Sequence, residues 1–329
     1  MKILIVCRWK VFYPNKFMPF VQEQGEAVRA LGHEVEFFLA KGNYMKVWIE
    51  LNAKIRDFQP DVIHAHFGIC GFVAALQRKV PVVVTYPGSD INDKRIRPIS
   101  ILTMRLSRYN LFMSKRQIAK VQRYAKPEKS EVLRYGIMSD LFVEQDKSKA
   151  RKVLGLDQNK KYVQFSGRFN RPGKDPELAK KVIEVVNSRK SRVDNREPIV
   201  ELLQLTGGFS KEQMVNIMNA VDAALVTSKS EGSPQFTKEV MSCGTPIVSV
   251  DVGDVAEQVV GLEGCWVAKT RDAEELADLV EKAIDFGKTK GHQHILDLGW
   301  DVKQVAKRLI DIYEGVIYNG KDKNDIEKE

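Results

Sequence analysis

The stretch Glu231-Gly-Ser-Pro-Gln-Phe-Thr-Lys-Glu239 decides how the fold of this chain is interpreted. Ser233 is a favourable N-cap residue, and Pro234 suits the first helical position, where a missing N–H costs nothing. Cys243-Gly-Thr-Pro246 then ends the helix, with Gly at the C-cap and Pro just beyond it. Amides without partners lie at the positive end of the helix dipole, so the sequence predicts an anion site at this helix start.

The same stretch brings two carboxylates to the predicted anion site. Glu231 precedes the anion site that the amides of Gln235, Phe236 and Thr237 would form, and Glu239 lies about one turn inside the helix. Two Glu residues eight positions apart occur often by chance on a solvated helix. The pair gains its weight from the setting, a buried strand, a turn, a short helix and the next buried strand.

A second loop supplies positive charge. Tyr162-Val-Gln-Phe-Ser-Gly167 predicts a strand that ends in Gly, and Gly167 allows a close backbone approach. Arg168 and Lys174 follow in the loop, where a guanidinium fork and an ammonium point charge can converge on phosphate oxygens. The alternative is that both are solvated loop cations, which are common in this chain.

Composition limits the possible classes of protein. A length of 329 residues suggests about two domains, and 43% hydrophobic residues can fill two cores. The four cysteines lack metal-site spacing and are typical of reduced thiols in a cytosolic protein; they are Cys7, Cys70, Cys243 and Cys265. No run of about 18 apolar residues predicts a membrane span, and the start of the chain is too short for a secretory signal and predicts a first strand.

The positive charge is concentrated in the first half. Residues 1–150 contain 25 Lys and Arg against 14 Asp and Glu, a net +11, whereas residues 151–329 contain 27 against 29. No nucleic-acid-binding motif accompanies this charge, so an anionic membrane surface is the favoured partner over nucleic acid. The segment Arg105 to Lys126 predicts a further basic helical stretch. A loop mixes aromatic and basic residues and suits a membrane interface; it contains Arg8, Trp9, Lys10, Phe12, Tyr13, Lys16, Phe17 and Phe20. The alternative for either segment is an ordinary solvated helix with a hydrophobic face toward the core.

Strand and helix patterns alternate in both halves, which is typical of parallel sheets covered by helices. Neither G-x-G-x-x-G nor a Walker loop is present, so a dehydrogenase and a P-loop enzyme are disfavoured. The predicted class is α/β with two doubly wound, Rossmann-like domains. In the first half we expect strands at 2–7, 35–39, 62–66 and 82–86, and helices at 19–31, 47–58 and 71–79.

These patterns resemble the retaining glycosyltransferases of family 4, which have the GT-B fold. The resemblance rests on Glu231 and Glu239 with the flanking segments Lys211–Ser230 and Pro246–Glu257, and on Trp300–Tyr313 as the C-terminal helix. It implies two domains that face a cleft, with an acceptor-side domain at 1–150 and a sugar-nucleotide donor domain at 151–300. It also implies a helix at 301–318 that packs back toward the first domain, followed by a frayed tail at 319–329.

The resemblance also implies roles for individual residues. Arg168 and Lys174 would neutralise the diphosphate of a sugar nucleotide, Glu231 would hold the donor sugar, and Glu239 would bind the ribose hydroxyls. No metal and no cofactor is implied beyond the donor substrate itself. Further donor-binding candidates are Gly167, Gly232, Ser233, Pro234, Gln235 and Phe236.

The acceptor side departs from the family pattern. Trp9–Pro19 replaces the usual Gly-rich loop after the first strand, and Pro87 stands where many members have a His that contacts the donor sugar. His64 and His66 share one strand face, and His66 lies nearest the ligand-binding edge, either as a contact or as a satisfied core His. Asp90 is a loop cap or an acceptor contact. The acceptor-side candidates are His66, Gly88, Ser89 and Asp90.

The implied activity is transfer of a sugar from a nucleoside-diphosphate sugar to a saccharide acceptor. A lipid-linked acceptor in surface polysaccharide synthesis is expected, with the protein cytoplasmic and peripheral on the inner face of the cell membrane. Two alternatives remain open. One is a catalytically weak sugar-nucleotide-binding protein, suggested by Pro87 and the missing Gly-rich loop. The other is a GT-B sugar-nucleotide epimerase, which would lack the Glu pair in this setting.

Overall fold

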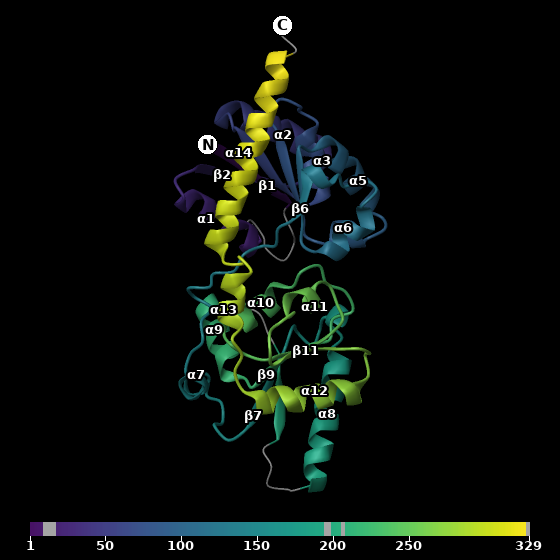
Figure 1. The fold of residues 1–329 in the computed structure, drawn as a ribbon, viewed down its shortest axis with the longest axis vertical. Coiled ribbons are helices and arrows are strands. Elements are labelled where there is room, and N and C mark those ends of the chain that lie inside the picture. The colour runs from purple at the N-terminus through teal and green to yellow at the C-terminus, as the bar shows by residue number, and fades with distance from the viewer. Residues whose placement is uncertain (9–17, 194–198, 205–207, 327–329) are drawn as a thin grey trace. The chain divides into compact units, whose positions relative to one another are not determined.

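The chain forms two compact units, each built on its own parallel sheet (Figure 1). The computed structural model describes residues 1–8, 18–193, 199–204 and 208–326. The first unit contains Met1–Gly136 and Trp300–Glu329, and the second contains Ile137–Gly299. The doubly wound α/β architecture predicted from the alternating pattern is confirmed.

The first unit has a six-stranded sheet in the order β2-β1-β3-β4-β5-β6. Its strands are β1 (Lys2–Arg8), β2 (Glu34–Ala40), β3 (Val62–His66), β4 (Val82–Tyr86), β5 (Tyr109–Phe112) and β6 (Ser130–Val132). Its helices are α1 (Pro19–Ala30), α2 (Tyr44–Phe58), α3 (Gly68–Ala75), α4 (Ser89–Asn92), α5 (Arg97–Leu106), α6 (Lys115–Val121), η1 (Pro127–Lys129) and α14 (Val302–Ile326).

Alternating strand residues divide the core of the first unit between the two faces of the sheet. In β1, Leu4 and Val6 pack in one cluster with α2 and α3, whereas Ile3 and Ile5 pack in the other with α1 and α14. Figure 1 shows α1 and α14 side by side, and the two helices are in contact. The C-terminal helix therefore completes one of the two helix layers of this unit.

The second unit has a five-stranded sheet in the order β11-β10-β9-β7-β8. Helices α8 and α12 pack together, and α12 lies against β9, β10 and β11. Its strands are β7 (Lys161–Phe165), β8 (Val200–Leu203), β9 (Ala223–Val226), β10 (Ile247–Val250) and β11 (Cys265–Ala268). Its helices are α7 (Lys147–Leu154), η2 (Pro172–Lys174), α8 (Pro176–Val193), α9 (Lys211–Ala220), α10 (Gln235–Ser242), α11 (Val255–Gln258), α12 (Ala273–Phe286) and α13 (Gly291–Asp297).

The boundary between the units lies at Gly136, earlier than the predicted residue 150. A Cβ at Gly136 would lie only 2.5 Å from Cα of Val302, so the chain is still packed on α14 at this point. A few residues later it is bonded into the second unit, because the Asn219 amide donates to the carbonyl oxygen of Val143 at 3.0 Å. This boundary differs from the predicted residue 150, because the bond that ties the segment to the second unit joins residues 76 positions apart.

Other predicted elements also differ from the structure. The basic segment Arg105 to Lys126 is not one helical stretch, because the buried strand β5 interrupts it. The helix expected at 71–79 is α3, and it ends before Gln77, whose side chain accepts from the amides of Lys79 and Val80. The tail expected to be frayed from residue 319 is helical as far as Ile326.

Candidate functional site

An ion pair lies at the carboxyl ends of two neighbouring strands of the second unit. Nζ of Lys174 is 2.5 Å from Oε1 of Glu231, and the two side chains are only 18% and 16% exposed. Lys174 ends the short helix η2 after β7, and Glu231 lies in the turn after β9, which pairs with β7. In open α/β sheets this edge is where ligands bind.

The backbone around Lys174 is fixed by a hydroxyl group and a glycine. Oγ1 of Thr227 donates to the carbonyl oxygens of Lys174 and Asp175, each at 2.9 Å. Asp175 has a positive φ of 54° and is paired with Arg271 at 2.7 Å. At Gly167 a Cβ would lie 2.8 Å from Cγ of Lys174, so only Gly leaves room for the lysine stem. Lys174 is therefore the neighbour whose close approach Gly167 permits.

The start of α10 differs from the prediction by one residue. Pro234 is the N-cap, with ψ of 124°, and Gln235 is the first helical residue. Ser233 precedes the N-cap, and its Oγ accepts a hydrogen bond at 3.2 Å from Nε2 of Gln258. No side chain of the N-cap residue takes the first-turn amides, so this helix start keeps the character of an anion site.

Gln258 is a buried residue that holds this helix start in place. Its Nε2 also donates to Oδ1 of Asp254 at 2.7 Å, and its Oε1 accepts from the hydroxyl of Thr237. Nε2 of His294 lies 2.9 Å from the carbonyl oxygen of Gln258. No local signal in the sequence predicts this role of Gln258, because its partners in α10 and α13 are more than twenty residues away along the chain.

Gly253 is a second residue of the site that was not among the predicted site residues. It has φ of +59°, and a Cβ there would lie 2.8 Å from the carbonyl oxygen of Gly232 and 3.0 Å from Cβ of Glu231. The glycine therefore lets the loop after β10 approach the turn that carries Glu231. A Gly in the short loop that follows a buried strand is the signal that could have identified this position.

Buried polar groups at the same edge have no hydrogen-bond partner among the described residues. They are both amide atoms of Gln164 in β7, Oγ of Ser166 just after β7, and Oγ of Ser228 just after β9. A buried polar group without a partner is costly, and such groups often mark a place where water or a ligand binds. They lie in or just after β7 and β9, the strands that lead to Lys174 and Glu231.

The structure does not bring every predicted residue to the ion pair. Arg168 is exposed, and within the described part of the chain its guanidinium forms neither an ion pair nor a hydrogen bond. Glu239 and Phe236 lie on α10 and are partly exposed. Lys174, Glu231, Gly167, Gly232 and Ser233 therefore form the centre of the site, and the roles of Arg168 and Glu239 remain predictions.

The acceptor-side candidates lie together at the carboxyl edge of the first sheet. His66 ends β3, Gly88 and Ser89 follow the adjacent strand β4, and Asp90 comes next. Oδ2 of Asp90 accepts from the amide of Gly68 at 3.0 Å, and Oδ1 accepts from the amide of Gly88 at 3.1 Å. Of the two interpretations of Asp90, the geometry supports the loop cap.

His66 is buried beside two aromatic neighbours. Its Nδ1 is 2.8 Å from the hydroxyl of Tyr135, and its ring lies 4.4 Å from the ring of His64. Nε2 of His66 has no partner among the described residues. Burial, and secondarily the charge of His64, lowers the pKa of His66 well below its usual value, and burial lowers the pKa of His64 to about 3. Both imidazoles are therefore neutral at pH 7.

The aromatic and basic loop predicted after β1 lies mostly outside the described residues. Phe20, its last aromatic residue, is on α1, with its ring 4.5 Å from the ring of Tyr135, so it belongs to the core and not to an interfacial loop. The described helices include none that is long and apolar enough to cross a membrane. No group of three His, Cys, Asp or Glu that could hold a metal ion occurs in the described ranges.

Two family models together match most of the chain. "Glycosyltransferase Family 4" matches residues 11–140, and "Glycosyl transferases group 1" matches residues 146–292. The chain belongs to glycosyltransferase family 4. The second model covers the strand–turn–helix of Glu231 and Glu239, which is the feature that suggested the family from the sequence.

Several family 4 relatives match over much of this chain. A Bacillus subtilis protein named as a teichuronic acid biosynthesis glycosyltransferase, TuaC, is 28% identical over 70% of this chain and 62% of its own length. A D-inositol 3-phosphate glycosyltransferase of Mycolicibacterium smegmatis is 27% identical over 68% of this chain and 60% of its own. The chain thus spans less than two thirds of the length of these relatives.

Solved structures show the same fold at low sequence identity. A sucrose-phosphate synthase of Thermosynechococcus elongatus has a TM-score of 0.74 at 17% identity, and the match covers 96% of this family 4 chain and 99% of that one. Anabaena HepE in complex with UDP-glucose has a TM-score of 0.70 at 16% identity, over 96% and 100% of the two chains. These likenesses confirm the GT-B fold predicted from the sequence.

Proposed function

We propose that this protein transfers a sugar from a nucleoside-diphosphate sugar to a saccharide acceptor, with retention of the anomeric configuration. The observation that carries the proposal is the Lys174–Glu231 pair at the carboxyl edge of the second sheet, beside the start of α10. It places a cation, a carboxylate and a helix start where open α/β sheets bind ligands. The complexes of HepE with UDP and UDP-glucose support this choice of donor class.

Breaking the bond between sugar and diphosphate places negative charge on the leaving phosphate. Lys174 and the first-turn amides of α10 stabilise that charge, and Arg168 reaches it from the exposed loop that follows β7. The ion pair with Glu231 holds the ammonium of Lys174 in position before the donor arrives, so little reorganisation is needed. Glu231 then binds hydroxyls of the donor sugar, and Glu239 binds the ribose.

Retention follows if the acceptor hydroxyl attacks from the face that the diphosphate leaves, with the leaving phosphate taking the proton. This route needs no carboxylate nucleophile, so Glu231 and Glu239 are free to bind the donor. The acceptor site in this proposal is the carboxyl edge of the first sheet, where Nε2 of His66 is buried without a described partner.

The proposed acceptor is a lipid-linked saccharide, in the synthesis of a surface polysaccharide, with the protein docked on the inner face of the cell membrane. The basic first half supports this acceptor, as does the name of the relative TuaC. Helix α2 adds exposed apolar side chains that suit an interface; Tyr44, Met45 and Ile49 are 55%, 68% and 56% exposed.

A panel of sugar nucleotides tests the donor part of the proposal. A donor at about one hundred times its dissociation constant stabilises the folded protein by about 2.7 kcal/mol, which raises the midpoint of thermal unfolding by several degrees. Lys174→Ala should abolish that shift. Failure of every sugar nucleotide to shift the midpoint would contradict the proposal. Binding without sugar transfer, with any candidate acceptor, would favour the weak binding protein instead.

A further inference from the structure

A pocket of about 520 Å³ lies at the amino-terminal edge of the first sheet, opposite the edge that carries His66. The strands β3, β4, β5 and β6 are parallel neighbours, so the segments that lead into them meet at this edge. The lining combines these segments with the ends of α3 and α5 and with Ile317 of α14. The pocket is therefore separate from the candidate acceptor edge of the same unit.

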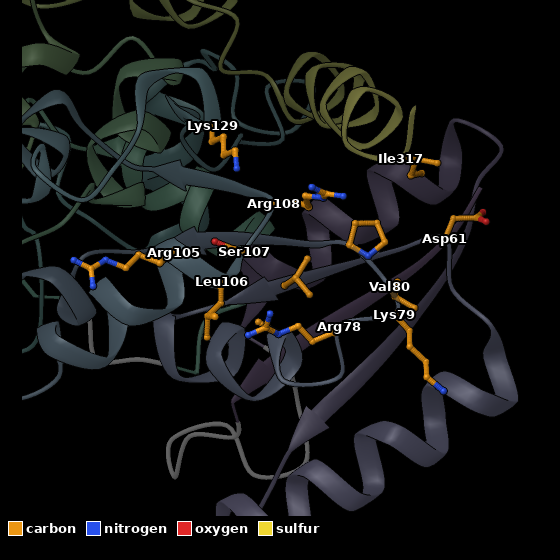
Figure 2. A pocket seen from close by; sticks show the side chains of 13 residues that line it. Asp61, Arg78, Lys79, Val80, Arg105, Leu106, Ser107, Arg108, Lys129 and Ile317 are labelled. Atoms are coloured by element: carbon orange, nitrogen blue, oxygen red, sulfur yellow. The ribbon is translucent and has the colours of Figure 1, made fainter. Parts of the chain in front are cut away.

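The lining is strongly basic (Figure 2). Five of its side chains are cationic and one is acidic; they are Arg78, Lys79, Arg105, Arg108 and Lys129, and Asp61. Asp61 already accepts a hydrogen bond at 2.7 Å from the backbone amide of Lys2. Figure 2 shows the ends of Lys79 and Arg105 extending outward, whereas Arg78 and Arg108 lie nearer the centre of the group.

The positive charges of the pocket are not neutralised within the described part of the chain. None of the five cationic side chains forms an ion pair or a side-chain hydrogen bond there, and Arg105 only lies over the ring of Tyr124, at 5.5 Å. Cations do favour helix C-termini, and α3 and α5 both end at this edge. Each helix end is equivalent to about half a negative charge, however, so two ends offset about one cation of the five.

We propose that this pocket binds a ligand through one or more phosphate groups. The guanidinium groups of Arg78 and Arg108 offer planar forks for phosphate oxygens, and Lys129 adds a point charge. The volume lies in the range of small-molecule sites, about 300–1,000 Å³. No lining residue is aromatic, so recognition rests on the phosphate and not on stacking of a base. The same chemistry is offered by a free phosphate compound or by an anionic lipid headgroup.

Calorimetry with inorganic pyrophosphate tests the proposal. The titration uses the full chain carrying Lys174→Ala, because Lys174 belongs to the other candidate phosphate site. Adding Arg78→Ala with Arg108→Ala should weaken pyrophosphate binding at least tenfold. The control pair, Lys181→Ala with Lys282→Ala, removes the same charge from exposed positions of the second unit and should have no such effect.

Vesicles of phosphatidylcholine with and without phosphatidylglycerol distinguish the two sources of phosphate. A tenfold loss of phosphatidylglycerol binding in the Arg78/Arg108 variant, with competition by pyrophosphate, assigns the pocket to a lipid headgroup. A loss of pyrophosphate binding with unchanged vesicle binding assigns it to a free phosphate compound. Lys129→Ala is a second, independent variant should the double variant fold poorly by circular dichroism. Equal affinities of pocket variants and control pair for both probes would overturn the proposal.

Discussion

Lys174 connects the loop after β7 to the segment after β9, both through its side chain and through its backbone. Its ammonium pairs with Glu231, and its carbonyl oxygen accepts a hydrogen bond from Thr227. Both partners lie in the segment that follows β9. The partners are more than fifty residues away in sequence. A change at this one residue therefore alters the charge of the site without removing core packing, since the side chain lies at the edge of the sheet.

Removal of the positive charge at Lys174 should reduce catalysis far more than stability. We expect Lys174→Ala, and Arg168→Ala likewise, to lower kcat/KM for the sugar-nucleotide donor by about 10²-fold, the usual loss of one charge-stabilising donor. Steady-state kinetics with the best donor of the panel measures this effect. The exposed Lys181→Ala serves as control. Near wild-type turnover in both site variants would show that the phosphate site is elsewhere.

The two glutamates should have separable effects. Glu239→Ala should weaken binding of the free nucleoside diphosphate, because its proposed partner is the ribose. Glu231→Ala should reduce sugar transfer more than nucleotide binding, because its proposed partner is the sugar. Isothermal titration with the nucleoside diphosphate measures the first effect, and donor turnover measures the second. The assignment of Glu239 is wrong if the nucleotide binds equally well with and without its side chain.

At the scale of elements, the side chain of Gln258 connects the start of α10 to α11. Gln258→Leu keeps the volume but leaves the hydroxyl of Thr237 and the carboxylate of Asp254 with one fewer buried partner. We expect a loss of about 2–3 kcal/mol in the free energy of unfolding of the second unit. Gln293→Leu is the control, because its bond to Asp297 is exposed and should matter by less than about 0.5 kcal/mol. Urea unfolding of both variants, compared with wild type, measures the difference.

Two buried histidines of β3, of which His64 lies between β4 and α14, should make the stability of the protein sensitive to acid. His64 lies between the hydroxyls of Tyr313 and Thr85, at 2.6 and 2.7 Å, and His66 lies beside it. Because burial lowers both pKa values, the unfolded chain binds more protons below about pH 6.5, and folding stability must fall as pH drops from there toward 3. Each imidazole contributes up to about 1.4 kcal/mol per pH unit.

Unfolding midpoints at several pH values between 7 and 4 test this sensitivity. A variant with His64→Gln and His66→Gln should lose stability less steeply with acid than wild type. Tyr313→Phe keeps both imidazoles and should retain the steep loss. Identical slopes in wild type and the double variant would show that other groups cause the acid sensitivity.

The elements that the sequence predicted well are those with a local signal. β3 and β4 were placed at their observed ends because Val62–His66 and Val82–Tyr86 are short apolar runs between turn residues. The details of the site had no local signal. Ser233 has a side chain typical of an N-cap, but its hydroxyl accepts a hydrogen bond from the side-chain amide of the distant Gln258. The Lys174–Glu231 pair joins residues that are 57 positions apart. Tertiary contacts of this kind decide which of several locally acceptable arrangements is adopted.

At the scale of the whole molecule, the distribution of charge leads to a prediction about membranes. Each basic residue near an anionic leaflet contributes about 1 kcal/mol, and salt screens this attraction. Binding to anionic vesicles should therefore fall steeply as the salt concentration rises, and the fluorescence of Trp9 should shift on binding. Vesicle sedimentation at several salt concentrations measures the effect.

Charge reversal at Arg8, Lys10 and Lys16 should weaken vesicle binding and leave nucleotide affinity unchanged. Reversal at three exposed lysines of the second unit provides a charge-matched control, for which Lys152, Lys181 and Lys282 are available. Equal binding to anionic and neutral vesicles at all salt concentrations would remove the membrane part of the proposal and favour a soluble acceptor.

The path of the chain through the two units has a consequence for the order in which they are made. The second unit is one continuous segment, Ile137–Gly299, whereas the first needs Trp300–Glu329 to complete a helix layer and to supply Tyr313 to His64. On the ribosome the amino-terminal sheet is synthesised first, yet the part of one face that α14 covers beside α1 stays exposed until residues 300–329 emerge. The later-synthesised unit can therefore finish folding first, and a nascent chain halted near residue 299 would display to chaperones the apolar surface that α14 covers in the folded protein.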